Sequence, residues 1–325
     1  MITAYCQRGG MLAAVPITAG AEIPADAVWI DLFRPEEGED RIIEAALGIS
    51  VPTREEMFEI EPSSRLRVEN GARYMTGAIV CNSEGERPAL AQISFILAGN
   101  RLTTVRYDEP TPFRLVVAKL DRSCPTGTRG ERLLLIMLDT IIDRAADIIE
   151  RLAVDIDAAS QQVFEPELER SGDSQRFRTI LKLLGRRGDL GSKVRESLVS
   201  MGRVVTFLST EGEAERFDKD QRALLKSMQR DVASLNDHVS YLGSKITFLL
   251  DATLGMVGIE QNNIIKIFAV LSVVLMPPTL IASVYGMNFQ HMPELDERWG
   301  YPIALVAMLA AAVVPYLFFK WKRWL

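Results

Sequence analysis

Residues 267–290 read IFAVLSVVLMPPTLIASVYGMNFQ and carry no charged side chain over their whole length. A second uncharged run covers residues 301–319, and the loop HMPELDERWG separates the two runs. A helix needs roughly 20 apolar residues to cross a bilayer. Both runs are long enough, so the sequence predicts two transmembrane helices near the C-terminus.

Short motifs surround these two runs. The first run ends in YGMNF (residues 285–289), the loop continues with MPEL (292–295), GYP (300–302) opens the second run, and the chain ends in KWKRWL (320–325). With these motifs in this order, the chain resembles the CorA-type magnesium transporters. The letters GMN alone arise by chance in many proteins, but their position at the end of the first of two C-terminal spans is specific.

This resemblance implies an architecture and an activity. The fold class is an α+β cytosolic domain followed by long helices and two C-terminal transmembrane helices, assembled as a funnel-like homo-oligomer with five subunits. The activity is transport of divalent cations, chiefly Mg²⁺, with gating by intracellular Mg²⁺ through acidic residues between subunits. Asp231, Asp237 and Asp251 are candidates for this regulatory metal site, and no spacing selects among them.

The expected organisation has six parts. Residues 1–125 form a cytosolic α/β domain, 126–215 a helical hairpin region, and 216–288 a long stalk helix that continues into the first transmembrane helix. Residues 289–300 form an external loop, 301–319 the second transmembrane helix, and 320–325 a basic cytosolic tail.

The first part alternates strand and helix signals. Strands are predicted at 28–32, 73–80, 91–97 and 102–107, and a helical pattern ends at Leu47. Residues 53–56, TREE, have the spacing of a capping box and predict a short helix. This part has no glycine-rich phosphate loop, nucleophile elbow or metal-ligand spacing, so we expect a regulatory or assembly module. With two histidines in the chain, His238 and His291, we expect neither an enzyme nor a cofactor.

Helical patterns dominate after residue 129. Helices are predicted at 132–163 and 177–208, although Gly185, Gly188 and Gly191 weaken the second by about 1 kcal/mol each relative to alanine. A seam of apolar residues with alternating spacings of three and four follows: Leu225, Met228, Val232, Leu235, Val239, Leu242, Ile246 and Leu249. The seam fits a coiled coil between copies or ordinary packing on the chain's own hairpin, and the sequence does not separate them.

The same spacing continues into the first transmembrane run, now in mostly polar and small residues. This stripe consists of Asn262, Ile265, Ala269, Ser272, Met276, Thr279 and Ser283, which share one helical face. Small and hydroxyl residues in membrane helices also serve close helix packing. The amide-bearing GMN end favours a pore lining, which requires several copies around an axis. Met276 is then a hydrophobic constriction, whereas Pro277 and Pro278 indicate a bend.

The residues after the stripe suit an ion entrance. Mg²⁺ prefers six oxygens and gives up its waters reluctantly, so a ring of Asn288 side-chain oxygens could accept hydrogen bonds from those waters. A carboxylate ring there could hold the ion too tightly for release. Gly286 permits close approach at the helix end, Met287 packs, and Glu294 in the loop raises the local cation concentration.

Charge indicates orientation and partners. Lys266, Lys320, Lys322 and Arg323 flank the spans, whereas the loop between them is acidic, so both termini are expected in the cytoplasm. The membrane is then the cell inner membrane, and the basic tail contacts lipid headgroups. The net charge of −6 gives no reason to expect nucleic acid. Cys6, Cys81 and Cys124 form no CxxC pair and are expected as buried, reduced thiols.

Two alternatives remain open at this stage. The same architecture could transport Co²⁺, Ni²⁺ or Zn²⁺; the MPEL loop favours Mg²⁺, while Gln290 and His291 beside it leave the choice open. A non-conducting, membrane-anchored coiled-coil scaffold would explain the heptads and the two spans. It would leave Asn288 and the polar stripe without a role.

Overall fold

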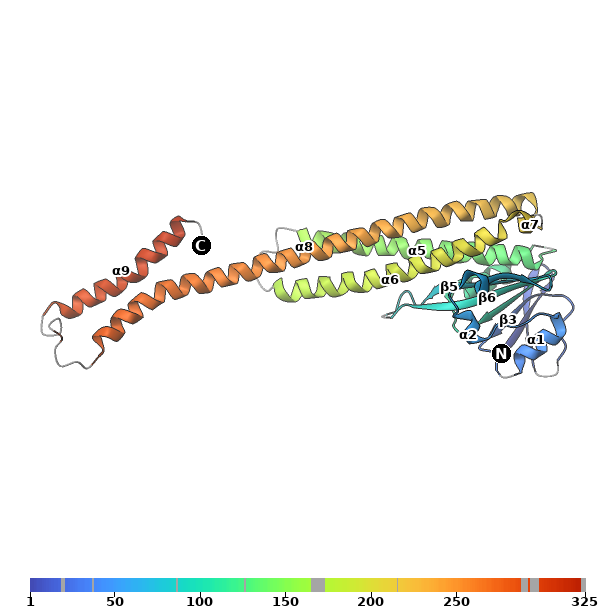
Figure 1. The fold of residues 1–325 in the computed structure, drawn as a ribbon, viewed down its shortest axis with the longest axis horizontal. Coiled ribbons are helices and arrows are strands. Elements are labelled where there is room, and N and C mark those ends of the chain that lie inside the picture. The colour runs from blue at the N-terminus through green and yellow to red at the C-terminus, as the bar shows by residue number, and fades with distance from the viewer. Residues whose placement is uncertain are drawn as a thin grey trace. The chain divides into compact units, whose positions relative to one another are not determined.

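The computed structural model describes residues 1–18, 21–36, 38–85, 87–125, 127–164, 173–214, 216–287, 292 and 298–322. The chain divides into two compact units. The first comprises Met1–Ser171 and Arg178–Leu250, and the second comprises Gly172–Phe177 and Asp251–Leu325. The first unit holds the α/β domain and a bundle of long helices, and the second holds the end of the longest helix and the last helix (Figure 1).

The α/β domain is built around one seven-stranded sheet. Its strands are β1 (Ile2–Arg8), β2 (Met11–Ile17), β3 (Ala27–Phe33), β4 (Leu66–Glu69), β5 (Ala72–Cys81), β6 (Ala89–Ala98) and β7 (Arg101–Arg106). The strand order is β2-β1-β3-β7-β6-β5-β4. β3 and β7 are parallel, and the other neighbouring strands are antiparallel. The four predicted strands correspond to β3, β5, β6 and β7, and all four are confirmed.

The β1–β2 hairpin was not among the predicted strands. Gly9 and Gly10 join its two strands with φ values of 57° and 78°. A two-residue hairpin loop with both residues at positive φ is the turn that glycine pairs favour. The Gly-Gly pair was therefore the signal that could have revealed this hairpin.

Short helices surround the sheet. They are α1 (Glu39–Leu47), α2 (Arg54–Met57), α3 (Pro62–Arg65) and α4 (Thr111–Arg122). α1 and α2 confirm the predicted helices. The capping box is present, since the Glu56 amide donates to Thr53 Oγ1 (3.3 Å) and the Thr53 amide donates to Glu56 Oε2 (2.8 Å). Ile43, Met57 and Phe113 from these helices are at most 2% exposed, so the helices close the core over the sheet.

A buried ion pair joins β3 to β7. The Arg106 guanidinium donates to both carboxylate oxygens of Asp31, with the shortest contact at 2.8 Å, and the two side chains are 10% and 3% exposed. Thr104 Oγ1 also donates to Asp31 (2.7 Å), and Trp29 Nε1 donates to Thr104 Oγ1 (2.9 Å). Because a buried charge is costly unless it is paired and hydrogen-bonded, this network stabilises the sheet as a unit.

Long helices follow the sheet. They are α5 (Gly130–Phe164), α6 (Asp173–Leu208), the short α7 (Glu211–Ala214), α8 (Lys219–Tyr285) and α9 (Gly300–Trp321). α5 and α6 confirm the two predicted helices and begin a few residues earlier. A Cβ at Gly191 would lie 3.4 Å from Leu152, and one at Gly202 would lie 3.1 Å from Val232. Some α6 glycines therefore allow close approach between helices, which offsets their cost to the helix.

The apolar seam of α8 packs within its own chain. Seven of the eight predicted seam residues are buried, namely Leu225, Met228, Val232, Val239, Leu242, Ile246 and Leu249, and Leu235 is half-buried. Lys245 of α8 forms an ion pair with Asp157 of α5, and Val232 faces Gly202 of α6. The structure therefore selects packing on the chain's own hairpin over a coiled coil between copies.

The three cysteines are free. Cys6 and Cys124 are buried as expected, whereas Cys81 is only half-buried because it lies at the end of β5. Burial raises the pKa of the Cys81 thiol to about 12, and Asp108 adds to the effect. This thiol is therefore protonated near neutral pH.

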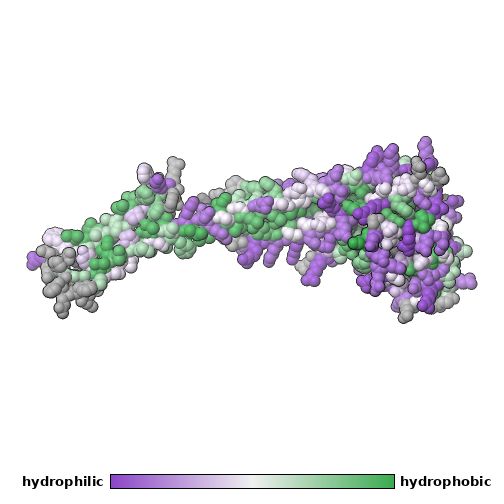
Figure 2. Space-filling view, viewed as in Figure 1, coloured by the Kyte–Doolittle hydropathy of each residue, from purple (hydrophilic) through white to green (hydrophobic). Residues whose placement is uncertain are grey.

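Among the described residues, two helices are long and apolar enough to cross a membrane. They are α8 and α9, each with an 18-residue window of mean hydropathy 2.2 of which only 6% is buried. Hydrophobic surface covers α9 and the C-terminal part of α8, whereas hydrophilic residues gather on the α/β domain (Figure 2). A surface this apolar requires a cover, such as lipid or further apolar helices.

Candidate ion pathway

The stripe residues lie exposed along the C-terminal part of α8. All seven, from Asn262 to Ser283, are exposed in a single chain, with Ile265 at 63% and Met276 at 68%. α8 is one helix of 67 residues, so alternating spacings of three and four keep them on one face. One chain therefore presents a narrow face of small, amide and hydroxyl groups on an otherwise apolar surface.

Part of this stripe forms a groove. An open depression of about 520 Å³ is lined by Ser272, Met276, Thr279 and Ser283 together with Leu271, Leu275 and Leu280. The structure thus brings four of the seven predicted residues into one groove, while Asn262, Ile265 and Ala269 precede it on the same helix. The three leucines were not predicted, because each lies one position away from a stripe residue and so falls outside the spacing of three and four. The sequence feature that could have revealed them is an apolar residue next to Ser272, Met276 and Thr279.

Two hydroxyls of the stripe donate hydrogen bonds to their own helix. Ser272 Oγ donates to the carbonyl oxygen of Phe268 (2.8 Å), and Thr279 Oγ1 donates to that of Leu275 (2.7 Å). A hydroxyl has one proton and two lone pairs, so each proton is committed and the lone pairs are left as acceptors. Such oxygens suit the donor hydrogens of water molecules around a cation.

α8 stays helical across Pro277 and Pro278. Proline has no amide hydrogen, so the carbonyls of Val273 and Val274 lack the usual partner four residues later. In lipid such a carbonyl requires another partner, such as a neighbouring helix or water.

The helix ends at the predicted entrance motif. The Gly286 amide donates to Ala282 (2.9 Å), and the Met287 amide donates to Val284 (3.3 Å). A Cβ at Gly286 would lie 3.0 Å from the Ala282 carbonyl oxygen, and Gly286 does not have a positive φ. Glycine therefore serves close approach at this helix end. Met287 is 46% exposed, and Asn288 and Glu294 lie outside the described residues.

The three aspartates proposed for regulation are not brought together within one chain. Asp231, Asp237 and Asp251 all lie on α8 and are exposed. At about 1.5 Å per residue, Asp237 and Asp251 are separated by roughly 21 Å along the helix. Among the described residues, no group of three or more His, Cys, Asp or Glu side chains could hold a metal ion. A site that uses these aspartates therefore requires ligands from elsewhere.

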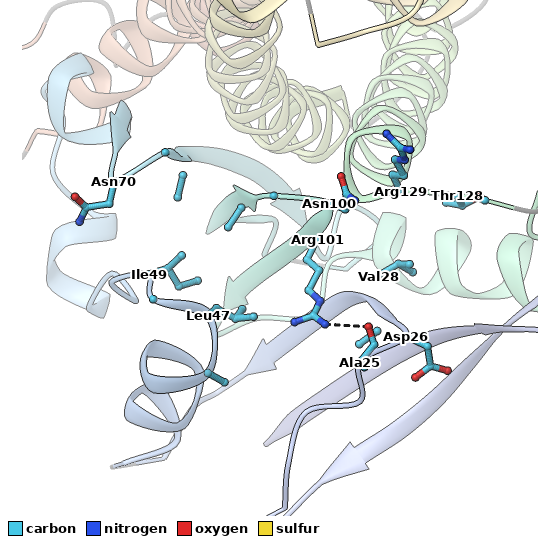
Figure 3. Close-up of a pocket in the computed structure, with 18 residues that line it drawn as sticks. Ala25, Asp26, Val28, Leu47, Ile49, Asn70, Asn100, Arg101, Thr128 and Arg129 are labelled. Carbon is cyan, nitrogen blue, oxygen red and sulfur yellow. Dashed lines mark hydrogen bonds between the residues drawn. The ribbon is translucent and has the colours of Figure 1, made fainter.

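A cavity of the α/β domain is lined by other residues than this pathway. It measures about 680 Å³, lies at one end of the sheet, and is lined by small side chains together with Leu47, Ile49, Arg101 and Arg129 (Figure 3). Arg101 Nη2 donates to the carbonyl oxygen of Ala25 (2.9 Å), and Asp26 is the one carboxylate among the described residues of the lining. With Arg101 and Arg129 beside a single carboxylate, the cavity does not suit a divalent cation.

Comparison with known proteins reveals close relatives. A family model described as "CorA-like Mg2+ transporter protein" matches residues 24–323. The magnesium transport protein CorA of Yersinia pseudotuberculosis is 34% identical over 325 residues, which is 100% of both chains. The CorA of Salmonella typhimurium is 36% identical over 300 residues, or 92% of each chain.

A solved structure shares the fold. The structure of the CorA magnesium transporter from Methanocaldococcus jannaschii matches with a TM-score of 0.74 and 18% identity, covering 100% of this chain and 99% of that one. The match extends over the sheet, the long helices and the two membrane-length helices.

Proposed function

The chain belongs to the CorA-like Mg²⁺ transporter family, and from this premise we propose that it conducts hydrated Mg²⁺ through a pore lined by α8. The observation that carries the proposal is the exposed stripe, which runs along one face of α8 and leads to the YGMN motif. A single helix cannot enclose water, so the pore requires a homo-oligomer. We propose five subunits, the number that the resemblance in the C-terminal motifs implies.

The stripe supplies the chemistry that a hydrated ion requires. Mg²⁺ dehydrates reluctantly, so its waters must find acceptors along the path. The hydroxyl oxygens of Ser272 and Thr279, whose protons are already donated to the helix, offer such acceptors. Asn262 and Ser283 extend the polar face, and Met276 forms a hydrophobic constriction that water and ions cross only when the pore widens.

The entrance lies at the end of α8. Asn288 contacts the ion's waters through its amide oxygen, Gly286 lets the backbone turn close to the last helical carbonyls, and Met287 packs beside them. Glu294 in the loop attracts cations to the entrance. Neutral amides bind a hydrated ion weakly enough to release it, which conduction demands.

The charges that flank the spans set the orientation. Lys266 precedes the first apolar run, and Lys320 and Lys322 follow the second, so both chain ends face the cytoplasm and the loop faces outward. The α/β domain and the helical bundle then lie on the cytoplasmic side of the inner membrane.

Influx requires no coupled energy source. A potential of about 100 mV, negative inside, supplies about 2.3 kcal/mol per charge and so about 4.6 kcal/mol for a divalent cation. Intracellular Mg²⁺ closes the pore by occupying sites that include Asp231, Asp237 or Asp251. Because α8 separates these aspartates, each site would be completed by another copy of the chain.

Ion flux into vesicles tests the proposal. Purified full-length protein in proteoliposomes should admit Mg²⁺, read by an entrapped dye, at a rate that rises as the imposed potential becomes more negative inside. Protein-free vesicles supply the background. Absence of flux from folded protein would favour a non-conducting scaffold.

Comparison of the ions addresses which of them the pore transports. Mg²⁺, Co²⁺, Ni²⁺ and Zn²⁺ are supplied outside in separate experiments, and the entry of each ion is followed. We expect Mg²⁺ to enter at concentrations where Zn²⁺ does not. Faster entry of Co²⁺ or Ni²⁺ than of Mg²⁺ would assign the same pore to those ions.

A further inference from the structure

A groove on the surface of α6 holds an excess of positive charge. Its volume is about 560 Å³, and its lining includes Ile60, Arg65, Arg195, Glu196, Val199 and Arg203. We call it the basic groove. Three arginines face one glutamate there, so the groove favours an acidic partner.

The arginines of the basic groove are not neutralised within their own chain. Arg65 Nε donates to the backbone carbonyl of Glu59, and Arg195 and Arg203 are exposed and form no ion pair within the described part of the chain. Burial lowers the pKa of Arg65, and the nearby Arg203 adds to this effect, while Glu196 opposes it. The guanidinium groups therefore repel one another in the free subunit.

Apolar surface adjoins these charges. Ile60 is 78% exposed and Val199 is 38% exposed. A second groove of about 650 Å³ continues from Val199 and Arg203 to α8, where Ala233 and Asn236 line it. Apolar surface rimmed by polar groups is typical of a protein interface, and arginine is enriched in such interfaces.

The opposite charge gathers elsewhere on the same unit. Asp139 and Asp143, which lie four residues apart on one face of α5, and the exposed Asp231 of α8 form what we call the acidic flank. Burial raises the pKa of Asp139, and the charges of Asp143 and Asp231 raise it further, while Lys119 opposes them. Asp231 accepts a hydrogen bond from Ser227 Oγ (3.3 Å), and none of the three aspartates has an ion-pair partner among the described residues.

The basic groove and the acidic flank lie on opposite sides of α8. Val232 is 7% exposed and faces the bundle. Successive helical residues differ by about 100°, so Ala233 and Asp231 point to opposite sides of Val232. Ala233 lines the groove on the α6 side, whereas Asp231, on the other side of Val232, raises the pKa of Asp139 on α5. One copy thus carries two complementary faces, both within its first unit.

We propose that neighbouring copies of this chain dock through these faces, with the basic groove of one copy receiving the acidic flank of the next. The inference rests on the proposed homo-oligomeric pore and assigns its cytoplasmic interface. An interface between two different faces is head-to-tail, and repetition of it closes into a ring when the rotation fits. Each contact sets the three arginines of the groove, with Glu196 among them, against the three aspartates of the flank, with Lys119 beside Asp139, and covers Ile60 and Val199.

This interface also separates the roles of the α8 aspartates. Asp231 becomes part of an ion pair between copies, which a bound metal would have to displace. Asp237 and Asp251 are then left as the α8 candidates for a regulatory metal site.

A photochemical cross-link tests the interface. Benzoylphenylalanine is placed at position 199 of the full-length protein, the membranes are irradiated, and the adducts are identified by mass spectrometry. We expect adducts to peptides of a second copy that contain residues 139–143 or 231. Adducts to lipid would assign the groove to the membrane instead, and adducts to other peptides, or none, would also overturn the proposal.

Charge reversal supplies the matched control. Arg203→Glu should reduce the cross-linked fraction about tenfold, which corresponds to a change of 1.4 kcal/mol in binding. The pair Arg203→Glu with Asp231→Arg should restore it, whereas Arg178→Glu, an exposed arginine elsewhere on α6, should not change it. An equal cross-linked fraction in wild type and Arg203→Glu would contradict the interface. Wild-type protein that is monomeric would instead refute the proposed pore, and an oligomer that conducts without this cross-link would refute the interface alone.

Discussion

The α/β domain and the C-terminal part of α8 differ in the burial of their polar groups. In the domain, Asp31 is 3% exposed and receives hydrogen bonds from both Arg106 and Thr104 of the same chain. On α8, the stripe from Asn262 to Ser283 is exposed along its whole length, amid large apolar side chains such as Phe268 and Leu280. Asp31 is buried and paired inside the fold, whereas the stripe residues are exposed, with the Ser272 and Thr279 hydroxyls donating to carbonyls of their own helix.

This difference indicates where each region finds its partners. A buried polar group must be satisfied inside the fold, because leaving it unpaired costs about 1–3 kcal/mol or more. A polar face on a membrane helix has no such partner in lipid, so it requires other helices or water. The buried Asp31–Arg106 pair is therefore satisfied within one chain, whereas the stripe would find its partners in the water-filled pore proposed above.

Removing the Asp31 carboxylate should have the largest effect on stability. Asp31→Ala leaves the Arg106 charge buried without a partner, which we expect to lower the free energy of unfolding by about 3–5 kcal/mol. Thermal unfolding of the full-length protein in detergent measures it. Asp26→Ala, which removes the exposed partner of Arg8, is the control and should leave the midpoint unchanged. Equal midpoints for wild type and Asp31→Ala would show that the buried pair does not hold the sheet.

Close packing at the start of α5 gives a second test of how the domain is stabilised within one chain. A Cβ at Gly130 would lie 2.6 Å from the backbone of Arg101 and Leu102, so Gly130→Ala forces a backbone shift. We expect a loss of about 1–3 kcal/mol in unfolding free energy. Gly185→Ala on α6 meets no atom within 4 Å and should stabilise the protein by up to about 1 kcal/mol. A destabilised Gly185→Ala variant would mean that its surface is covered by another copy.

A single hydroxyl on the stripe should affect transport without affecting stability. Thr279→Val removes one acceptor from the groove, and we expect Mg²⁺ flux to fall roughly two- to tenfold, the worth of one hydrogen bond of about 0.5–1.5 kcal/mol. Thr247→Val is the matched control, because its hydroxyl also donates four residues back, to Gly243 (3.2 Å), but it lies off the stripe. Equal loss in both variants would argue against a specific role for the groove.

Local patterns sufficed for much of the fold. Strands β3, β5, β6 and β7 and helices α5 and α6 were predicted because each carries a long periodic or β-branched run. The edge strand β4, with only four residues, was missed because so short a run is hard to distinguish from a loop. The Asp31–Arg106 pair could not be predicted, because the two residues lie 75 apart and meet only through the parallel pairing of β3 and β7.

The candidate site was also predictable only in part. The stripe followed from spacing alone, because a helix converts spacings of three and four into one face. Whether the apolar seam of α8 packs within or between chains required tertiary structure, since both arrangements use the same heptads. The orientation of the Ser272 and Thr279 hydroxyls toward their own helix depends on side-chain rotamers, which the sequence does not specify.

The most direct test of the central claim is Mg²⁺ flux in proteoliposomes for Asn288→Ala compared with Asn263→Ala. Both substitutions remove one amide, but Asn288 ends the stripe's path whereas Asn263 is an exposed neighbour one residue off the stripe. A pore with its entrance at Asn288 predicts that Asn288→Ala lowers flux about tenfold or more, the effect of roughly 1.4 kcal/mol, while Asn263→Ala conducts like wild type. Wild-type flux through Asn288→Ala would contradict the account.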